Sequence, residues 1–229
     1  MKKLYIFISS LAVLSLTCAA AKTEMPNSML EGRRAKVYGK YPEAVTLFQT
    51  YLDKNPGSAY NPEVQYLIGE SYHLMGQKDK AKESYKKVLD NYLKSPYAAL
   101  SYRELAKYAN EEGQYQKAID YYKLAKQVLA SDANIERCTF ETAKIYHQGM
   151  KNYDAALAEY SKLTKDLKNQ HISPQALLNM ATIYAEQKKY DKALEKYKII
   201  VNEYSWSDES KPAAEEIKKL EAQPADNHS

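Results

Sequence analysis

Glycine and cysteine are scarce in this chain, and proline is modest. Its 229 residues include 7 glycines, 8 prolines and 2 cysteines. Alanine, leucine, lysine, glutamate and glutamine abound instead, and because these residues lose little side-chain freedom in a helix, the composition indicates a helical protein. Two cysteines provide no disulfide framework. We interpret Cys138 as a small buried hydrophobe rather than a reactive thiol.

Long runs of one charge are also missing. The formal net charge is +4, and acidic and basic residues are mixed along the whole chain. Nucleic-acid partners and anionic membrane surfaces usually require clustered positive charge. The sequence therefore indicates neither as a partner.

Catalytic and metal-binding signatures are absent as well. The sequence contains no glycine-rich phosphate loop and no nucleophile elbow. Among the histidines, only His73 has a carboxylate, that of Glu70, one helical turn away, and one such pair lacks the further ligands that a metal needs. We predict a protein without enzyme activity, cofactor or metal.

The first 21 residues have the pattern of an export signal. Met1-Lys2-Lys3 is basic, the stretch from Leu4 to Leu16 is mostly apolar, and small residues follow as far as Ala21. The apolar run is shorter than the roughly 20 residues that a membrane-spanning helix needs. We predict a signal peptide at residues 1–21, an exported protein, and no transmembrane helix in the mature chain.

Cys18 leaves the fate of this segment open. Cleavage after Ala20 or Ala21 would release a soluble protein. Alternatively, Cys18 is lipidated and anchors the protein, although Leu16 stands one place too late for the usual lipoprotein pattern. An uncleaved anchor is the third alternative.

A small residue recurs at nearly constant spacing. The copies lie 37 or 38 residues apart, at Ala44, Ala81, Ala118, Ala156 and Ala193. Five copies of one period indicate a solenoid of stacked units. The units span about residues 25–61, 62–98, 99–135, 136–173 and 174–206.

Each unit is predicted to form two amphipathic helices around a tight turn. A small residue in the first helix precedes the recurring alanine by 12 residues in four units, as Ala106 precedes Ala118. Small residues at both places allow the two helices to approach closely. The fourth unit has a spacing of 13, and we expect its additional residue in the turn from Gly149 to Asn152.

The aromatic residues follow the same period. The chain has 22 tyrosines against 3 phenylalanines and 1 tryptophan. One aromatic residue follows each recurring alanine by four positions and therefore lies on the same helical face. These residues are Phe48, Tyr85, Tyr122, Tyr160 and Tyr197. A phenol ring fills the space between helices while its hydroxyl reaches the rim, so we interpret these rings as structural.

The order of these residues resembles the tetratricopeptide repeat. In the second unit, Leu67-Ile68-Gly69-Glu70-Ser71-Tyr72 is followed by Gly76, Ala81 and Tyr85. The resemblance covers about residues 25–205 and implies an all-α, right-handed α-solenoid of five helix hairpins. The family repeat usually has 34 residues, so the longer period here implies lengthened second helices or connections.

A C-terminal capping helix is expected at residues 207–222. Ala213, Ile217 and Leu220 form one narrow apolar stripe beside charged residues, a pattern that suits a helix covering the last unit. We expect Trp206 to pack at this joint. The polar tail at 223–229 is expected to be frayed.

The resemblance also implies a binding surface. In tetratricopeptide proteins the first helix of each repeat lines a concave groove, and matching positions give a set of candidate partner-binding residues. They are Tyr66, Glu70, His73, Arg103, Lys107, Arg137, Phe140, Lys144 and His147. The middle of this set is basic, and arginine holds carboxylates through paired hydrogen bonds. Our hypothesis is an acidic extended peptide or helix as ligand; the alternative is a solvated face whose charges only prevent aggregation.

Together, the longer repeat and the export signal resemble an exported subgroup of bacterial envelope proteins, which includes subunits of outer-membrane β-barrel assembly and Tol–Pal coordinators. The likeness implies an interaction scaffold in the periplasm, free or attached to the outer membrane, that binds envelope proteins during outer-membrane biogenesis. One alternative is a Tol–Pal-type coordinator of cell division. Another is a peptidoglycan-binding module in which Tyr66 and Phe140 stack on sugar rings.

Overall fold

Nearly all of the described chain is helical. The structure is a computed structural model that describes residues 27–164 and 171–222. Within these residues the chain forms α-helices and one π-helical turn, and no β-strand. The elements are α1 (Asn27–Val37), α2 (Tyr41–Lys54), α3 (Asn61–Leu74), α4 (Lys78–Tyr92), α5 (Pro96–Glu111), α6 (Tyr115–Val128), α7 (Asp132–Lys144), η1 (Ile145–Gly149), α8 (Tyr153–Lys162), α9 (Ser173–Glu186), α10 (Tyr190–Glu203) and α11 (Ser210–Glu221).

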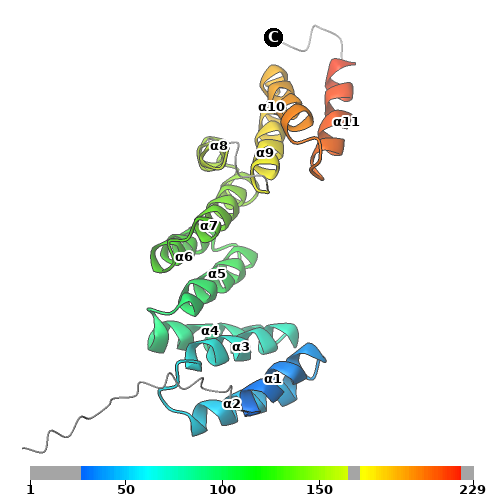
Figure 1. Ribbon diagram of the computed structural model, residues 1–229. Coiled ribbons are helices and arrows are strands. Elements are labelled where there is room, and N and C mark those ends of the chain that lie inside the picture. The colour runs from blue at the N-terminus through cyan, green and yellow to red at the C-terminus, as the bar shows by residue number, and fades with distance from the viewer. Residues whose placement is uncertain (1–26, 165–170, 223–229) are drawn as a thin grey trace, which may run out of the picture.

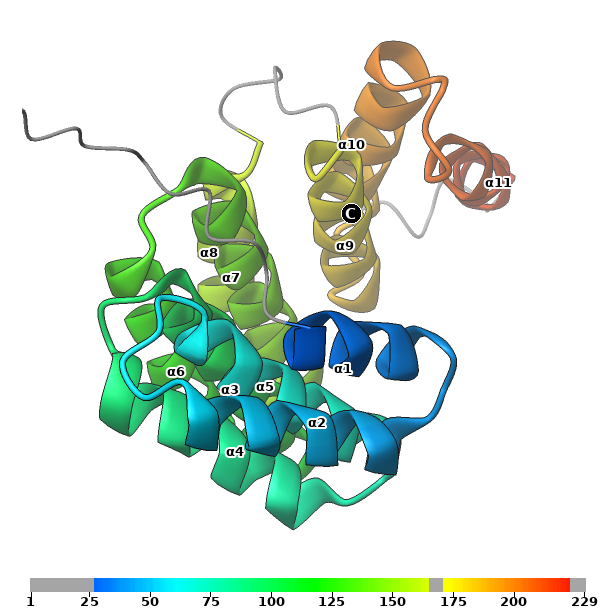
Figure 2. The ribbon, with the colours of Figure 1, turned by 60° about the horizontal axis from the view of Figure 1, so that its bottom comes forward.

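The helices pair into hairpins that stack in chain order. Helix α1 packs on α2, α3 on α4, α5 on α6, α7 on α8 and α9 on α10, and each hairpin also packs on the next one (Figure 1). The view in Figure 2 shows that successive hairpins are rotated relative to one another, so that the stack winds as it rises. The predicted all-α solenoid is confirmed.

The hydrophobic core runs along the stack instead of gathering at one centre. In the first of five clusters, Val64 and Ile68 of α3 pack with Phe48 of α2, which joins the first hairpin to the second. Three further clusters join hairpins in the same way, and the last one joins the fifth hairpin to α11. Each hairpin is therefore stabilised mainly by its neighbours, as in other solenoids.

The aromatic residues that follow each recurring alanine by four positions lie at the centre of each hairpin. All five side chains are buried, at Phe48, Tyr85, Tyr122, Tyr160 and Tyr197. In the first two hairpins the rings lie directly against glycine: a β-carbon added to Gly32 would stand 2.6 Å from Phe48, and one added to Gly69 would stand 2.6 Å from Tyr85. The small residues of the first helices thus allow the close helix crossing that the sequence predicted.

The turn inside each hairpin uses one residue with positive φ. It lies five positions before the recurring alanine, where the backbone reverses to begin the second helix. These residues are Gly39, Gly76, Gly113, Lys151 and Lys188. Glycine adopts this conformation without steric cost, so the lysines of the fourth and fifth hairpins are the strained members of the set.

The fourth hairpin differs from the sequence prediction. Its additional residue was expected between Gly149 and Asn152, but the structure places it earlier, in the π-helical turn η1, where Met150 donates to the carbonyl of Ile145 over 2.9 Å. The wider turn brings Gly149 against Tyr115 of the preceding hairpin, 2.7 Å from where its β-carbon would lie. Accommodating the residue there preserves the positive-φ turn at Lys151.

The helix at the C-terminal end covers the last hairpin. Ala213 and Leu220 of α11 are buried against α10, as the apolar stripe predicted. Trp206 stays 57% exposed, although its ring stacks edge-on with that of Tyr204 at a centroid distance of 6.3 Å. The joint is therefore packed mainly by Tyr204 and the helix stripe.

Several sequence predictions fall outside the described residues. They are the signal peptide at 1–21 with its Cys18 and the tail at 223–229. Among the helices that the structure does describe, none has the length and apolar character to cross a bilayer. Cys138, at the centre of the chain, is fully buried, which confirms its interpretation as a core residue.

Candidate protein-binding groove

The predicted groove residues all lie on the first helices of the hairpins, in α3, α5 and α7 with its extension η1. They do not form one uniform surface. Some of them tie one hairpin to the next, some are buried, and some stay exposed. Which residues belong to each group decides where a partner can bind.

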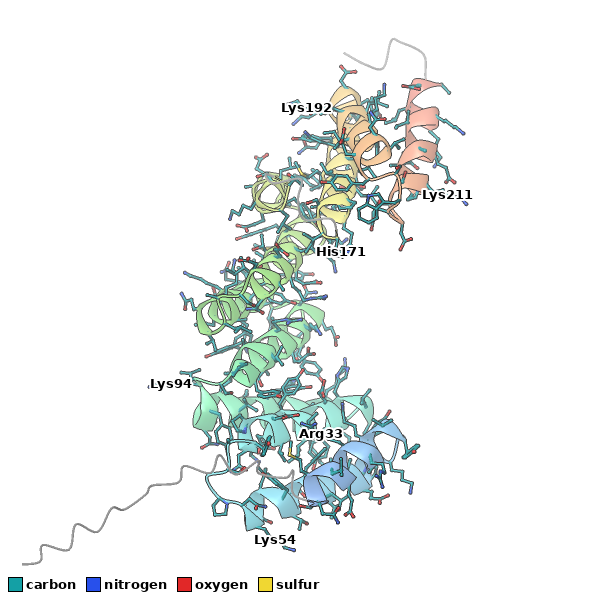
Figure 3. All side chains as sticks on the ribbon, in the orientation of Figure 1. Arg33, Lys54, Lys94, His171, Lys192 and Lys211 are labelled. Atoms are coloured by element: carbon teal, nitrogen blue, oxygen red, sulfur yellow. The ribbon has the colours of Figure 1, made fainter. Side chains whose placement is uncertain are left out.

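At the N-terminal end, ion pairs between hairpins occupy the groove charges. Arg33 of α1 pairs with Glu63 of α3, and Figure 3 labels Arg33 near this junction. One turn further along α1, the Lys36 ammonium lies 2.9 Å from the Glu70 carboxylate. Glu70, a candidate binding residue, is thus already held by its neighbour.

Tyr66 and His73 connect α3, in the second hairpin, to α5 of the third hairpin. Tyr66 is only 8% exposed, and its ring lies 5.5 Å from the ring of Tyr85 and 5.7 Å from that of Tyr97. Its burial raises the pKa of the Tyr66 hydroxyl far above the ordinary value. The exposed His73 forms a hydrogen bond of 2.6 Å between its Nδ1 and the Tyr108 hydroxyl. Tyr66 therefore supports the groove wall, whereas His73 remains accessible from outside.

The surface between α5 and α7, which we call the α5–α7 step, is organised differently. A cavity of about 380 Å³ opens there. It is lined by residues of α5, α6, α7 and η1: Lys107, Asn110, Glu111, Tyr115, Tyr122, Glu141, Lys144, Ile145, Gln148 and Gly149. Polar and charged side chains dominate this lining, so the cavity suits a polar ligand group.

Among the residues that the structure describes, the two lysines of this cavity pair only within their own helices. The Lys107 ammonium lies 2.7 Å from the Glu104 carboxylate and the Lys144 ammonium 3.1 Å from that of Glu141, each three residues apart. Lys144 also lies over the ring of Phe140, 5.8 Å from its centroid. The lysine ends of both pairs are more exposed than their carboxylates, so a partner carboxylate can reach the two ammonium groups.

Two arginines add uncompensated charge around this step. Within residues 27–164 and 171–222, neither the half-buried Arg103 nor the exposed Arg137 forms an ion pair. Phe140, between them and Lys144, is half-buried and packs edge-on against Tyr160 at a centroid distance of 5.7 Å. The middle of the groove therefore presents positive side chains that no other hairpin holds.

His147 lies deeper than its position in the groove series suggests. Only 3% exposed in η1, it directs Nε2 to the Glu186 carboxylate of α9 at 3.3 Å. Tyr153 donates a hydrogen bond to the same carboxylate, and this bond raises the pKa of Tyr153. His147 thus joins the fourth hairpin to the fifth.

Sequence reasoning identified the four basic residues of the central step but missed the counter-charges of the two lysines. Glu104 and Glu141 precede Lys107 and Lys144 by three residues, a spacing at which side chains meet on a helix surface. That spacing is readable in the sequence. The cavity itself is not, because it depends on the π-turn and on how two hairpins stack.

Known proteins share this architecture. Residues 38–103 and 175–205 match models of the tetratricopeptide repeat. A tetratricopeptide repeat protein from Parabacteroides merdae superposes with a TM-score of 0.63 at 16% identity, covering 88% of this chain and 81% of that one. A structure of MamA gives 0.60 at 20% identity, with 82% and 96% covered.

A third similar structure is that of YrrB, a tetratricopeptide protein with an unusual peptide-binding site. Its TM-score is 0.58 at 17% identity, and the match covers 82% of this chain and 90% of that one. No curated protein sequence matches this chain. At these identities, the structural likeness describes the fold.

Proposed function

We propose that this tetratricopeptide-repeat protein, an interaction scaffold by fold, binds an acidic extended peptide or helix of a partner protein at the step between α5 and α7. We further propose that it works in the bacterial cell envelope, where it helps to assemble an outer-membrane complex. It acts by binding and positioning the partner, without chemistry of its own.

One observation carries the binding site: the basic residues of this step are not used to join hairpins. Arg33 and Lys36 pair with carboxylates of the next hairpin, whereas Lys107 and Lys144 pair only within their helices. Partner binding at the α5–α7 step therefore leaves the contacts between hairpins intact. Arg103 supports the same ligand, since its guanidinium can hold a carboxylate with two parallel hydrogen bonds.

Charge reversal tests the binding site. We expect Arg103→Glu with Lys107→Glu to abolish capture of the partner by crosslinking in cells. The control, Lys94→Glu with Lys123→Glu, makes the same change in charge at exposed positions on other elements, and Lys94 is labelled in Figure 3 on the connection between α4 and α5. Equal capture by both double variants would refute the basic groove.

The chemical state of the N-terminus tests the envelope assignment. This assignment rests on the predicted signal peptide and on the resemblance to exported envelope proteins. Mass spectrometry of the protein from its cell distinguishes the two candidate roles: a lipidated Cys18 favours outer-membrane assembly, and a free N-terminus at Ala21 or Lys22 favours a Tol–Pal-type coordinator. A chain that retains Met1 in the cytoplasm would contradict both.

The groove offers less to a sugar than to a peptide. Tyr66 is buried and Phe140 packs against Tyr160, so neither ring presents a free face for stacking. The charges of the α5–α7 step instead match carboxylates. Parallel pull-downs with peptidoglycan fragments and with envelope proteins separate these ligands, and we expect retention of protein alone.

A further inference from the structure

The outer face of α1 carries an exposed stripe. Its members recur every three or four residues and therefore lie on one side of the helix: Asn27, Leu30, Glu31, Arg34, Val37 and Tyr38. Three of them are large apolar side chains, with exposed fractions of 46% for Leu30, 83% for Val37 and 73% for Tyr38. A shallow cavity of about 310 Å³ continues the stripe to Leu47 of α2.

In the second hairpin two of the matching apolar positions are covered, whereas Leu74, which matches Val37, stays 50% exposed. Leu67 of α3 and Met75, directly after α3, correspond to Leu30 and Tyr38 by the repeat spacing, and both pack against the core of the first hairpin. At the opposite end of the stack, α11 covers the last hairpin. Among the described residues, no helix performs this role for α1, and the three apolar side chains of the stripe stay exposed.

The charges on this face indicate what covers it. Of the three basic residues of α1, Arg33 and Lys36 pair with α3. Within the described chain, Arg34 and Glu31 are left without an ion pair, although Asn27 donates a hydrogen bond of 2.9 Å to Glu31. Around the apolar residues, the face thus carries both signs in equal number, counting Lys40 and Glu43 of α2.

We propose that this face binds a second copy of the same chain, with the two α1 helices antiparallel across a two-fold axis. An isologous contact requires a self-complementary patch, and the stripe has one. Its negative residue lies in the first half of α1 and its free positive residue in the second half. Antiparallel pairing therefore places Glu31 opposite the Arg34 of the other copy, twice, and buries Val37 and Tyr38 at the edges of the contact.

Analytical ultracentrifugation of the whole protein over a range of concentrations tests the proposal. We expect a monomer–dimer equilibrium at low salt. Glu31→Arg and Arg34→Glu should each place like charges opposite one another and raise the dimer dissociation constant by about tenfold or more. Tyr38→Asp should weaken the dimer comparably, and Trp206→Asp, at the far end of the stack, should leave it unchanged.

Mixing gives the sharpest result. Neither single charge variant should dimerise well alone, but an equimolar mixture of Glu31→Arg with Arg34→Glu should form heterodimers, because both contacts then join opposite charges. Circular dichroism of each variant establishes that it is folded. A protein that stays monomeric up to its solubility limit, or a mixture that fails to associate although both variants are folded, would overturn the proposal. Partner capture through the α5–α7 step is measured separately and does not depend on it.

Discussion

The ring of Tyr85 lies against the backbone of Gly69, so close that a β-carbon at position 69 would stand 2.6 Å from its Cε1 atom. The ring cannot move aside, because it is 1% exposed and packs against Tyr66 on its other side. This contact holds α3 and α4 close together and leaves no room for a side chain at position 69.

We therefore predict that Gly69→Ala destabilises the protein. Alanine favours a helix by up to about 1 kcal/mol, but overpacking a filled core costs about 1–3 kcal/mol, so the net loss should be about 1 kcal/mol in urea denaturation. In a Tyr85→Leu background, where the ring is absent, the same substitution should become neutral or stabilising. A loss of equal size in both backgrounds would show that the ring is not the cause.

Replacing Lys188 with glycine should stabilise the folded protein. Its φ of 59° lies in the left-handed region, at the position where three other hairpins have glycine. Relief of this strain, about 1–2 kcal/mol, exceeds the entropy that glycine adds to the unfolded chain, about 0.5–1 kcal/mol. We expect a modest gain of stability in urea denaturation.

Gly113→Ala is the matched control for this prediction. Position 113 has φ of 72° and open space around a new β-carbon, so the same two effects, backbone strain and unfolded-chain entropy, act here with opposite signs. It should lose about 1 kcal/mol. Opposite signs for Lys188→Gly and Gly113→Ala would confirm that the turn requires the left-handed conformation, and equal signs would contradict it.

The thiol of Cys138 should be inert in the folded protein. It is fully buried between α6 and α7, and burial raises its pKa to about 11. In a Cys18→Ser background, Ellman's reagent at pH 8 should react with Cys138 only after urea unfolds the chain. Fast reaction without urea would mean that α7 opens readily and that this part of the stack is less stable than its packing indicates.

The buried tyrosines should make the fold sensitive to alkali. Burial raises the pKa of Tyr108 to about 12 and raises those of Tyr85 and Tyr122 as well. An unfolded tyrosine ionises near pH 10, so the contribution of these groups to stability is complete below pH 10 and falls as the pH rises toward 12 and above.

Absorbance at 295 nm, followed together with circular dichroism, measures this effect. The buried rings should ionise only together with loss of helix. Ionisation of all tyrosines near pH 10 with the helical signal intact would contradict the burial of Tyr85 and Tyr122.

Much of the groove could be predicted from the sequence, and part of it could not. The repeat spacing placed Arg103, Lys107 and Lys144 on the first helices, where the structure has them. It gave no indication that Tyr66 and His147 are buried while Lys107 stays exposed. His147 matches the exposed His73 in the repeat, so its burial depends on the neighbouring hairpin and not on its place in the repeat.

The sequence alone determined the hairpins of this protein. Helical period, small residues and the aromatic rings that follow them act within about 40 residues, so each hairpin can be read locally. Tertiary structure decided which groove charges remain free. Pairs such as Lys36 with Glu70, or His147 with Glu186, join residues of successive hairpins. Whether such a pair forms depends on how one hairpin is rotated relative to the next. At the fourth hairpin, the π-turn at Ile145–Gly149 also changes the path of the chain.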